Sequence, residues 1–262
     1  MGEILSLVNQ KGGVGKTTSC YNLAAAIAHK KKVLMIDFDP QASLTLSTGY
    51  NPMDFDATIC DVIRGEIMIS DAVYKIENID KLRIIPSNKY LAKLEKDLSR
   101  HGNYEASRIL KSKVDEIKND FDYIFIDAPP QLSMLSINVL MASDFAVIPV
   151  EASLLGYYPL EEIADSIAEV RNELDAHLRI LGIMATKSDS RISSDKKILN
   201  ELRTQKDYKY LGTIKDAAAA KRGLDKGLPA VINEPKEDIS RAYKEIAENI
   251  IQSIKKIRKQ EE

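Results

Sequence analysis

Residues 9–18 read Asn9-Gln10-Lys11-Gly12-Gly13-Val14-Gly15-Lys16-Thr17-Thr18, and they say more about the fold than any other stretch of this sequence. An apolar run over residues 4–8 precedes them and is typical of a buried strand. The residues that follow, 19–29, carry apolar side chains at helical spacing. A glycine-rich loop between a strand and a helix is the context of a phosphate-binding loop, so the sequence predicts a nucleotide site.

The residue types in the loop suit a nucleoside triphosphate. Backbone at glycine approaches phosphate oxygens closely and turns its N–H groups inward, and the following helix adds the positive end of its dipole. Lys16 is placed to reach the β- and γ-phosphates, and the Thr17 hydroxyl is placed to bind Mg²⁺. We expect the nucleotide to contact Lys11, Gly12, Gly13, Val14, Gly15, Lys16, Thr17 and Thr18.

The loop departs from the ordinary G-x-x-x-x-G-K-[ST] pattern at its start. Gln10 stands where that pattern has glycine, and a second lysine, Lys11, precedes the glycine pair. K-G-G-x-G-K-T-T is the signature of the deviant Walker A ATPases, so the chain resembles the group that includes ParA/Soj partition proteins, MinD, the nitrogenase iron protein and the arsenite-pump ATPase. Two nucleotide-bound subunits dock face to face in that group. The resemblance implies that Lys11 is catalytic in the partner's site, as an arginine finger would be, with Lys16 catalytic in its own.

Length and composition predict a single domain over residues 1–262. The hydrophobic fraction of 44% is ordinary for a chain with a sizeable core, and no linker composition or repeat divides the sequence. No signal peptide or membrane-length apolar run is evident, and Cys20 and Cys60 are too few for a disulfide framework or a zinc site. The absence of Trp argues against nucleic-acid binding by aromatic stacking. We expect a cytoplasmic protein.

Strand-like and helix-like stretches alternate along the rest of the chain. Apolar runs occur at 33–38, 82–86, 123–126, 145–150, 180–185 and 211–214, and amphipathic stretches occur at 104–118, 156–176 and 193–205. This alternation predicts an α/β fold with a doubly wound, mostly parallel sheet flanked by helices. The resemblance of the loop implies a P-loop NTPase fold of the deviant Walker A type. Ligands bind beyond the carboxyl ends of such strands, so the loops after strands are the ones to search.

The loop after the second strand reads Asp37-Phe38-Asp39-Pro40-Gln41. Two carboxylates at a strand end can serve Mg²⁺ or an attacking water, and acidic residues before proline also simply begin turns. In ParA/Soj proteins the D-x-D-P-Q motif is switch I. The resemblance assigns Asp39 a catalytic role in positioning or activating water, with a water-mediated metal contact as a further option, and gives Asp37 a supporting role.

The second such loop, Asp127-Ala128-Pro129-Pro130, follows the apolar run at 123–126. An aspartate that ends a buried strand is either a helix cap or part of a cation site. Its place opposite a phosphate loop favours Mg²⁺, bound through water because this ion keeps several of its waters. The stretch also matches the Walker B and switch II motif of the ParA/Soj group.

The base-binding end of the site is less well defined by sequence. Thr186-Lys187-Ser188-Asp189 looks like the TKxD of signal-recognition GTPases, whereas Asp189-Ser190-Arg191 fits the D-[SA]-R element of ParA-like proteins better. The resemblance favours ATP, although spacing alone leaves GTP open. Residues 214–223 depart from the family's proline-containing segment, and only 227–229 preserve its end. The adenine contacts therefore stay unassigned.

The resemblance to ParA/Soj proteins runs from the first strand to about residue 190. It includes residues 61–66 after switch I and residues 85–88 at a later strand end. The chain begins almost at the phosphate loop, so we expect the short, Soj-like form without an N-terminal helix-turn-helix domain.

Basic residues are concentrated in one part of the chain. The net charge is −2, but residues 187–226 hold eleven Lys and Arg against six Asp and Glu. Solvated helix faces explain many single lysines, whereas together these residues can form a DNA-binding stripe that doubles on dimerisation. The candidates are Arg191, Lys196, Lys197, Arg203, Lys215, Lys221 and Arg222.

The resemblance therefore predicts an ATP-dependent DNA partition ATPase. Mg-ATP would drive a homodimer that binds double-stranded DNA without sequence preference on the nucleoid. A ParB-like centromere-binding partner would stimulate its slow hydrolysis. Other ParA-like positioning or regulatory ATPases remain alternatives.

A further alternative is a MinD-like ATPase whose C-terminal helix binds membranes. Residues 239–259 carry an isoleucine stripe and a basic end. The stripe has no Phe or Trp and the chain ends in Gln260-Glu261-Glu262, which anionic lipid would repel. We therefore expect this segment to pack against the sheet and expect no membrane partner.

Overall fold

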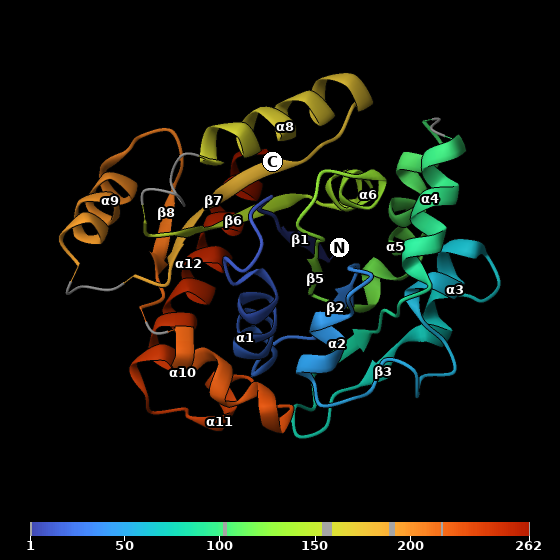
Figure 1. Ribbon diagram of the computed structural model, residues 1–262, viewed down its shortest axis with the longest axis horizontal. Helices are drawn as coiled ribbons and strands as arrows, with labels where there is room; N and C mark the ends of the chain where they lie inside the picture. The colour runs from blue at the N-terminus through green and yellow to red at the C-terminus, as the bar shows by residue number, and fades with distance from the viewer. Residues whose placement is uncertain (1, 102–103, 154–158, 189–191, 216, 262) are drawn as a thin grey trace.

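An eight-stranded sheet forms the centre of the computed structural model, which describes residues 2–101, 104–153, 159–188, 192–215 and 217–261 (Figure 1). The strands lie in the order β3-β4-β2-β5-β1-β6-β7-β8, and each neighbouring pair is parallel except β3 with β4. The strands are β1 (Glu3–Leu7), β2 (Val33–Asp37), β3 (Tyr74–Lys75), β4 (Leu82–Ile85), β5 (Tyr123–Asp127), β6 (Phe145–Glu151), β7 (Arg179–Thr186) and β8 (Tyr210–Thr213).

Helices cover both faces of this sheet (Figure 1). The first face carries α3 (Ile59–Arg64), α4 (Leu91–His101), α5 (Ile109–Ile117), α6 (Met134–Ala142), α8 (Pro159–Leu174) and α9 (Ser193–Thr204). The second face carries α1 (Lys16–Ala28), α2 (Ser43–Ser47), α10 (Ala217–Arg222), α11 (Ala230–Asn233) and α12 (Asp238–Glu261). Short 3₁₀ turns lie at η1 (Ile69–Ala72), η2 (Ala106–Arg108), η3 (Lys118–Asp120) and η4 (Leu224–Lys226).

Alternation along the central strands explains why both faces need helices. In β1, Leu5 and Leu7 belong to the core beneath α1 and α12, whereas Ile4 belongs to the core beneath α6 and α8. A strand that is apolar on both sides must be covered on both sides, which is the arrangement of doubly wound folds. The predicted fold class is therefore confirmed.

The register of three neighbouring strands sets the geometry of the site. Leu7 of β1 and Asp37 of β2 both pair with Asp127 of β5, which lies between these strands. All three strands run in the same direction, so their carboxyl ends lie side by side. The phosphate loop, switch I and the Asp127 loop therefore start from one edge of the sheet, as expected for this fold.

Two details differ from the sequence-based expectation. Strand β3 was not anticipated, because two residues are too few to show a period. The amphipathic stretch 104–118 is not one helix but η2 followed by α5. Asn138 of α6 accounts for this break, because it accepts a hydrogen bond from the Leu110 N–H at 3.1 Å and donates one to the Ala106 carbonyl at 2.8 Å.

The C-terminal helix α12 packs against the sheet and α1, as expected. Ile246, Ile250 and Ile254 on its apolar face are buried in the same core as α1. The face that a membrane-binding helix would need is thus occupied within the fold. Among the described helices, none combines the length and the hydropathy that a membrane span requires.

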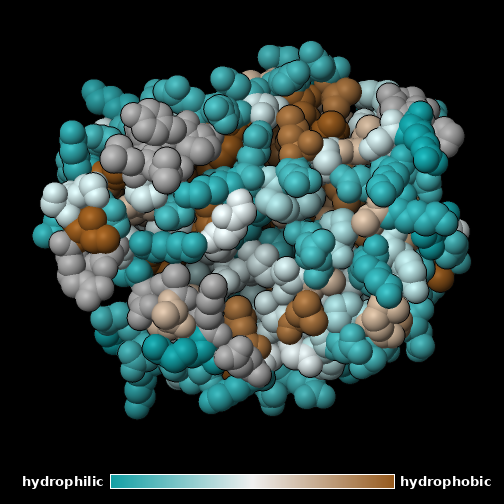
Figure 2. Space-filling model, in the orientation of Figure 1, coloured by the Kyte–Doolittle hydropathy of each residue, from teal (hydrophilic) through white to brown (hydrophobic). Residues whose placement is uncertain are grey.

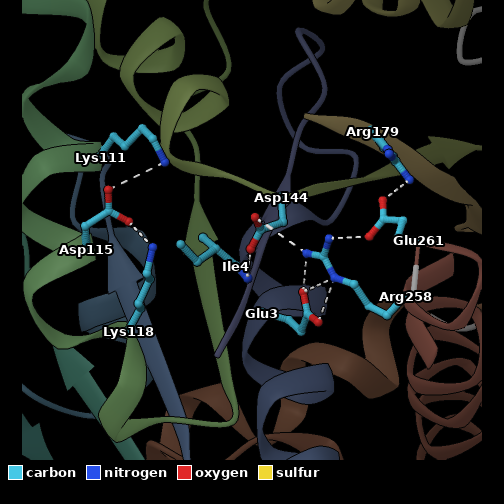
Figure 3. Close-up of polar contacts among 9 residues, drawn as sticks. All are labelled: Glu3, Ile4, Lys111, Asp115, Lys118, Asp144, Arg179, Arg258 and Glu261. Carbon is cyan, nitrogen blue, oxygen red and sulfur yellow. Dashed lines mark hydrogen bonds and ion pairs between the residues drawn. The ribbon is translucent and has the colours of Figure 1, made fainter. Parts of the chain in front are cut away.

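A charged cluster attaches the end of α12 to the edge of the sheet opposite the phosphate loop (Figure 3). Arg258 donates hydrogen bonds to the Glu3 carboxylate at 3.0 Å from Nε and at 2.7 Å from Nη2. It also donates to Glu261 at 2.9 Å and lies over the Phe145 ring. The neighbouring Asp144 carboxylate accepts the Ile4 N–H, so the cluster joins α12 to β1 and to the start of β6.

Removing the central cation of this cluster should destabilise the fold. Arg258→Leu leaves the Glu3 carboxylate, whose side chain is 18% exposed, without this partner. Because the Arg258 side chain is itself partly exposed, we expect the free energy of unfolding to fall by only about 1–2 kcal/mol. Urea denaturation measures the change. The exposed Lys256 on the same helix provides the control, and an equal loss in Lys256→Leu would contradict this assignment.

Candidate nucleotide-binding site

The phosphate loop has the backbone conformation that its glycines allow. Gly13 and Gly15 have φ angles of 76° and 90°, in the left-handed region where a side chain is strained. A side chain at Gly12 would meet no atom within 4 Å, so this position is open toward an incoming ligand. Helix α1 begins at Lys16, directly after Gly15. The N-terminal N–H groups of α1 therefore belong to the loop itself, where they suit an anion.

Lys16 lies across the base of the loop. Its Nζ donates a hydrogen bond to the Asn9 carbonyl at 2.9 Å, and the side chain is largely buried. Burial lowers the pKa of this ammonium, while the nearby carboxylates of Asp127 and Asp39 act in the opposite direction. The loop thus holds a buried cation between backbone carbonyls and two carboxylates.

Thr17 and Asp127 form the polar centre of the site. The Thr17 hydroxyl donates to Asp127 Oδ2 at 2.6 Å, and the other carboxylate oxygen, Oδ1, is buried with no hydrogen-bond partner among the described residues. Burial raises the pKa of Asp127 to about 8, and the charge of Asp37 adds to this shift. A buried acceptor without a partner is costly, and a cation is one group that satisfies it.

The two switch I carboxylates have different surroundings. Asp37 is fully buried, and burial raises its pKa to about 6 although Thr45 hydrogen bonds oppose the shift. Asp39 faces the cavity beside the phosphate loop, and its Oδ1 accepts the Gln41 N–H at 2.9 Å. Only Asp39 is therefore placed to meet a bound ligand, in keeping with the different roles expected for the pair.

The cavity beside the loop has a volume of about 350 Å³. Loop residues 12–19, switch residues and the C-terminal part of the chain all line it. Its lining residues outside the loop are Asp39, Gln41, Ser43, Pro130, Thr186, Lys187, Ile214, Ala220 and Tyr243. Of the sequence-predicted phosphate-loop residues, Gly12 to Thr18 are thus brought together around one space.

Lys11 has a different environment from the rest of the loop. Its Nζ forms an ion pair with Glu151 Oε2 at 2.9 Å, and its side chain is 31% exposed. Glu151 ends β6, the strand next to β1, and the Lys11 hydrogen bond lowers the pKa of its carboxyl. Lys11 is therefore directed away from the cavity that Lys16 serves.

The sequence alone assigns no role to three residues near the cavity. Lys187 follows β7 with a φ of 53°, and a methyl group at Gly13 would lie 3.8 Å from its Nζ. Tyr243 of α12 is buried, and its hydroxyl oxygen lies 3.3 Å from the hydroxyl oxygen of Ser19 in the first turn of α1. Glu151 and Lys187 both stand at carboxyl ends of strands, which is the signal that points to them. Tyr243 has no such signal, since it comes from a distant helix.

The basic residues are placed at one edge of the sheet. Lys196 and Lys197 are exposed on α9, and Lys215 is exposed just after β8. Helix α9 lies beside β8 (Figure 1). These three lysines are therefore accessible to a large partner.

The other candidate cations are less available or lie outside the described part. Arg222 is ion-paired with Glu234 at 3.3 Å. Arg203 stacks on the Tyr210 ring, with its guanidinium carbon 5.8 Å from the ring centre. Two candidates cannot be placed because the structure does not describe them: residue Arg191, with the element 189–191 that contains it, and the side chain of Lys221.

Comparison with known proteins gives one family over most of the chain. The family described as "AAA domain" matches residues 2–180. The sporulation initiation inhibitor protein Soj of Bacillus subtilis is 31% identical over 252 residues, which cover 95% of this chain and 98% of Soj. The chromosome partitioning protein ParA of Caulobacter vibrioides is 30% identical, with 95% of this chain and 94% of that protein covered.

A solved structure shares the same fold. Cobyrinic acid a,c-diamide synthase of Mycobacterium smegmatis, crystallised with a bound ATP analogue and magnesium, superposes with a TM-score of 0.82 at 27% identity. The match covers 95% of this chain and 93% of the synthase.

The raised pKa of Asp127 predicts how stability changes with pH. The folded chain holds this proton with a pKa of about 8, above the ordinary value of 3.8. The proton therefore stabilises the ligand-free fold fully at low pH, and this contribution is lost as the pH rises through about 8. Asp127→Asn cannot lose a proton, so its stability relative to the wild type should increase by at least about 1 kcal/mol between about pH 6 and about pH 9.

Urea unfolding with chelator at both pH values measures this difference. The exposed Asp120 supplies a control, because Asp120→Asn should follow the wild-type pH dependence. Parallel stability curves for the wild type and Asp127→Asn would show that the carboxyl at 127 is not the titrating group.

Proposed function

The chain belongs to the ParA/Soj family of partition and positioning ATPases, and on this basis we propose that it is an ATP-dependent DNA partition ATPase. In this proposal residues 1–262 act as one ATPase domain. Mg-ATP brings two copies face to face, the dimer binds double-stranded DNA without sequence preference, and hydrolysis stimulated by a ParB-like partner releases it. The observation that carries the proposal is the Thr17–Asp127 pair beneath the phosphate loop, with Asp39 facing the same cavity.

The donor set at this pair suits magnesium. Thr17 offers a hydroxyl, and Asp127 offers the buried Oδ1 that has no partner among the described residues. Within the described part, no cluster of three or more His, Cys, Asp or Glu side chains could hold a metal alone. Mg²⁺ typically takes one or two protein ligands and completes its shell with phosphate oxygens and water. Bound Mg²⁺ neutralises negative charge that develops on phosphoryl oxygens, and the mycobacterial synthase supports the assignment.

The other roles in the proposed hydrolysis fall to groups of the protein itself. The N–H groups of the loop and the buried Lys16 hold the phosphates. Asp39, which lines the cavity, orients the attacking water. Lys11 is directed away from its own cavity by Glu151, which supports a role in the partner's site once the subunits dock.

The surface beside the loop supports docking of a second copy. Figure 2 shows mostly hydrophilic side chains on this face, with an apolar patch between α6 and α8. Leu132, two residues after Pro130 of switch II, is 51% exposed and lines a hollow together with Ile137 of α6 and Val170 of α8. Exposed apolar patches commonly mark interaction surfaces. Contact here would connect dimerisation directly to switch II.

The accessible lysines support the proposed DNA contact. Lys196, Lys197 and Lys215 keep their charges exposed, whereas Arg222 is engaged by Glu234. Arg191 and Lys221 remain candidates. An interaction made of phosphate contacts is sequence-independent and weakens steeply with salt, and a dimer doubles the number of contacts.

Retention on random-sequence plasmid DNA tests the proposed function. The wild-type chain should be retained with Mg-ATP and released with Mg-ADP or without nucleotide, and retention should fall steeply as salt rises. Equal retention with ADP and ATP, or none in any state, would contradict a DNA-partition role.

Charge reversal locates the contact. Lys196→Glu with Lys197→Glu should abolish retention without changing ATP binding, because these lysines lie outside the nucleotide cavity. The control reverses Lys93 and Lys96, two exposed lysines on α4. Equal loss of DNA retention in both double variants would indicate a general charge effect instead of a site on α9.

Asp39→Ala should separate assembly from hydrolysis. The variant keeps the phosphate loop and the Thr17–Asp127 pair, so it should form the ATP dimer while hydrolysis falls by about 100-fold or more. Phosphate release and size-exclusion chromatography with ATP measure the two properties. The exposed Asp56 supplies the control, and wild-type hydrolysis by Asp39→Ala would show that Asp39 has no such role.

A further inference from the structure

The main chain of Asp39 is held by groups that lie outside the nucleotide cavity. Ser87, which follows β4, donates from its hydroxyl to the Asp39 carbonyl at 2.8 Å. On the other side, the Asp39 N–H donates to Asp37 Oδ1 at 3.2 Å. Ser87 and Asp37 are fully buried. Both backbone groups of Asp39 are therefore fixed from the interior while its carboxylate faces the cavity.

One further hydroxyl joins these two contacts. Thr45 of α2 donates to Asp37 Oδ2 at 2.8 Å from its backbone N–H and at 2.7 Å from Oγ1. The same Oγ1 accepts the Ser87 N–H at 3.0 Å. Thr45 Oγ1 thus acts as donor and acceptor at once, and it connects the ends of β2 and β4 with the start of α2.

The segment after Asp39 needs such a restraint. Ala42 has a φ of 52°, a left-handed conformation that a residue with a side chain rarely adopts. Strained backbone of this kind persists only where surrounding contacts determine it. The Ala42 N–H bonds to the Asp39 carbonyl at 2.9 Å, which is the acceptor that the Ser87 hydroxyl also uses. The Asp39 carbonyl oxygen therefore accepts both the hydrogen bond from the strained Ala42 and the restraining hydrogen bond from Ser87.

We infer that Thr45 and Ser87 are positioning residues for the proposed hydrolysis of ATP, holding the Asp39 carboxylate at the place where it orients water. Neither residue lines the nucleotide cavity, so neither acts on substrate directly. The inference rests on the proposed function. A displacement of about 1 Å at a reacting group can lower a rate about 100-fold, so loss of either hydroxyl should affect turnover far more than ATP binding.

A purely structural role would give a different pattern. Loss of a buried hydrogen bond lowers stability wherever it occurs, whereas loss of positioning lowers kcat and leaves KM largely unchanged. The matched variants are Thr45→Val, which keeps the shape and removes the hydroxyl, and Thr45→Ser, which keeps the hydroxyl. Ser87→Ala removes the second contact. Ser143→Ala is the control, because Ser143 is buried and, among the described residues, its hydroxyl donates only to the Val139 carbonyl of the preceding helix α6.

The experiment measures kcat and KM for Mg-ATP together with the thermal midpoint of each variant. We expect kcat to fall about 10- to 100-fold in Thr45→Val and Ser87→Ala, with KM changed less than about twofold. Thr45→Ser should restore kcat. Ser143→Ala should keep the wild-type kcat even if its thermal midpoint falls as far as that of Thr45→Val or Ser87→Ala.

Three results would overturn the inference. Wild-type kcat in folded Thr45→Val would show that its hydroxyl does not position Asp39. If kcat fell equally in all four variants, and the thermal midpoint also fell equally in all four, then Thr45 and Ser87 would have a structural role only. An absence of hydrolysis by the wild-type chain would instead overturn the proposed function, and the inference with it.

Discussion

A fully buried carboxylate with one oxygen unpartnered among the described residues is the feature on which the nucleotide site depends. Asp127 ends the strand between β1 and β2, where burial and the nearby Asp37 both disfavour its charge. Thr17 and Lys16 compensate only in part. A structure selected for stability alone would place an apolar or fully hydrogen-bonded side chain here, since a buried carboxyl group with an unpartnered oxygen is costly. Binding of a cation and a triphosphate would offset this loss of stability, because the cation would satisfy the unpartnered oxygen.

The parallel sheet is what brings the required groups to that carboxylate. Three adjacent strands deliver the phosphate loop, switch I and Asp127 to one edge, and the next two strands add Glu151 and Lys187. The second core then joins α1 to α12, so that Tyr243 from the far end of the sequence reaches the base of the loop. The local sequence determines which functional side chains follow each strand. The strand order determines which of these side chains lie next to one another.

The sequence predicted the parts of the site that are contiguous motifs. The loop at 12–18, Asp39 and Asp127 could be found because each motif carries its own chemical signature next to an apolar strand. Glu151 and Tyr243 could not be assigned, since their roles depend on contacts with residues more than a hundred positions away. The same limit applies to the fold. Long buried strands were predictable from apolar runs, whereas β3 and the division of 104–118 depend on cross-strand pairing and on a side chain from α6.

We propose that two subunits share each active site, with Lys11 acting across the interface. Mixing Lys11→Ala with Asp39→Ala subunits tests it most directly, by measuring phosphate release from the mixture. If Lys11 acts in the partner's site, a mixed dimer has one complete site, which combines Asp39 of the first variant with Lys11 of the second. Since half of the dimers in an equimolar mixture are mixed, hydrolysis should recover to about a quarter of the wild-type rate. If Lys11 acts in its own subunit, no mixed dimer contains a complete site, and no recovery above the separate variants would contradict the account.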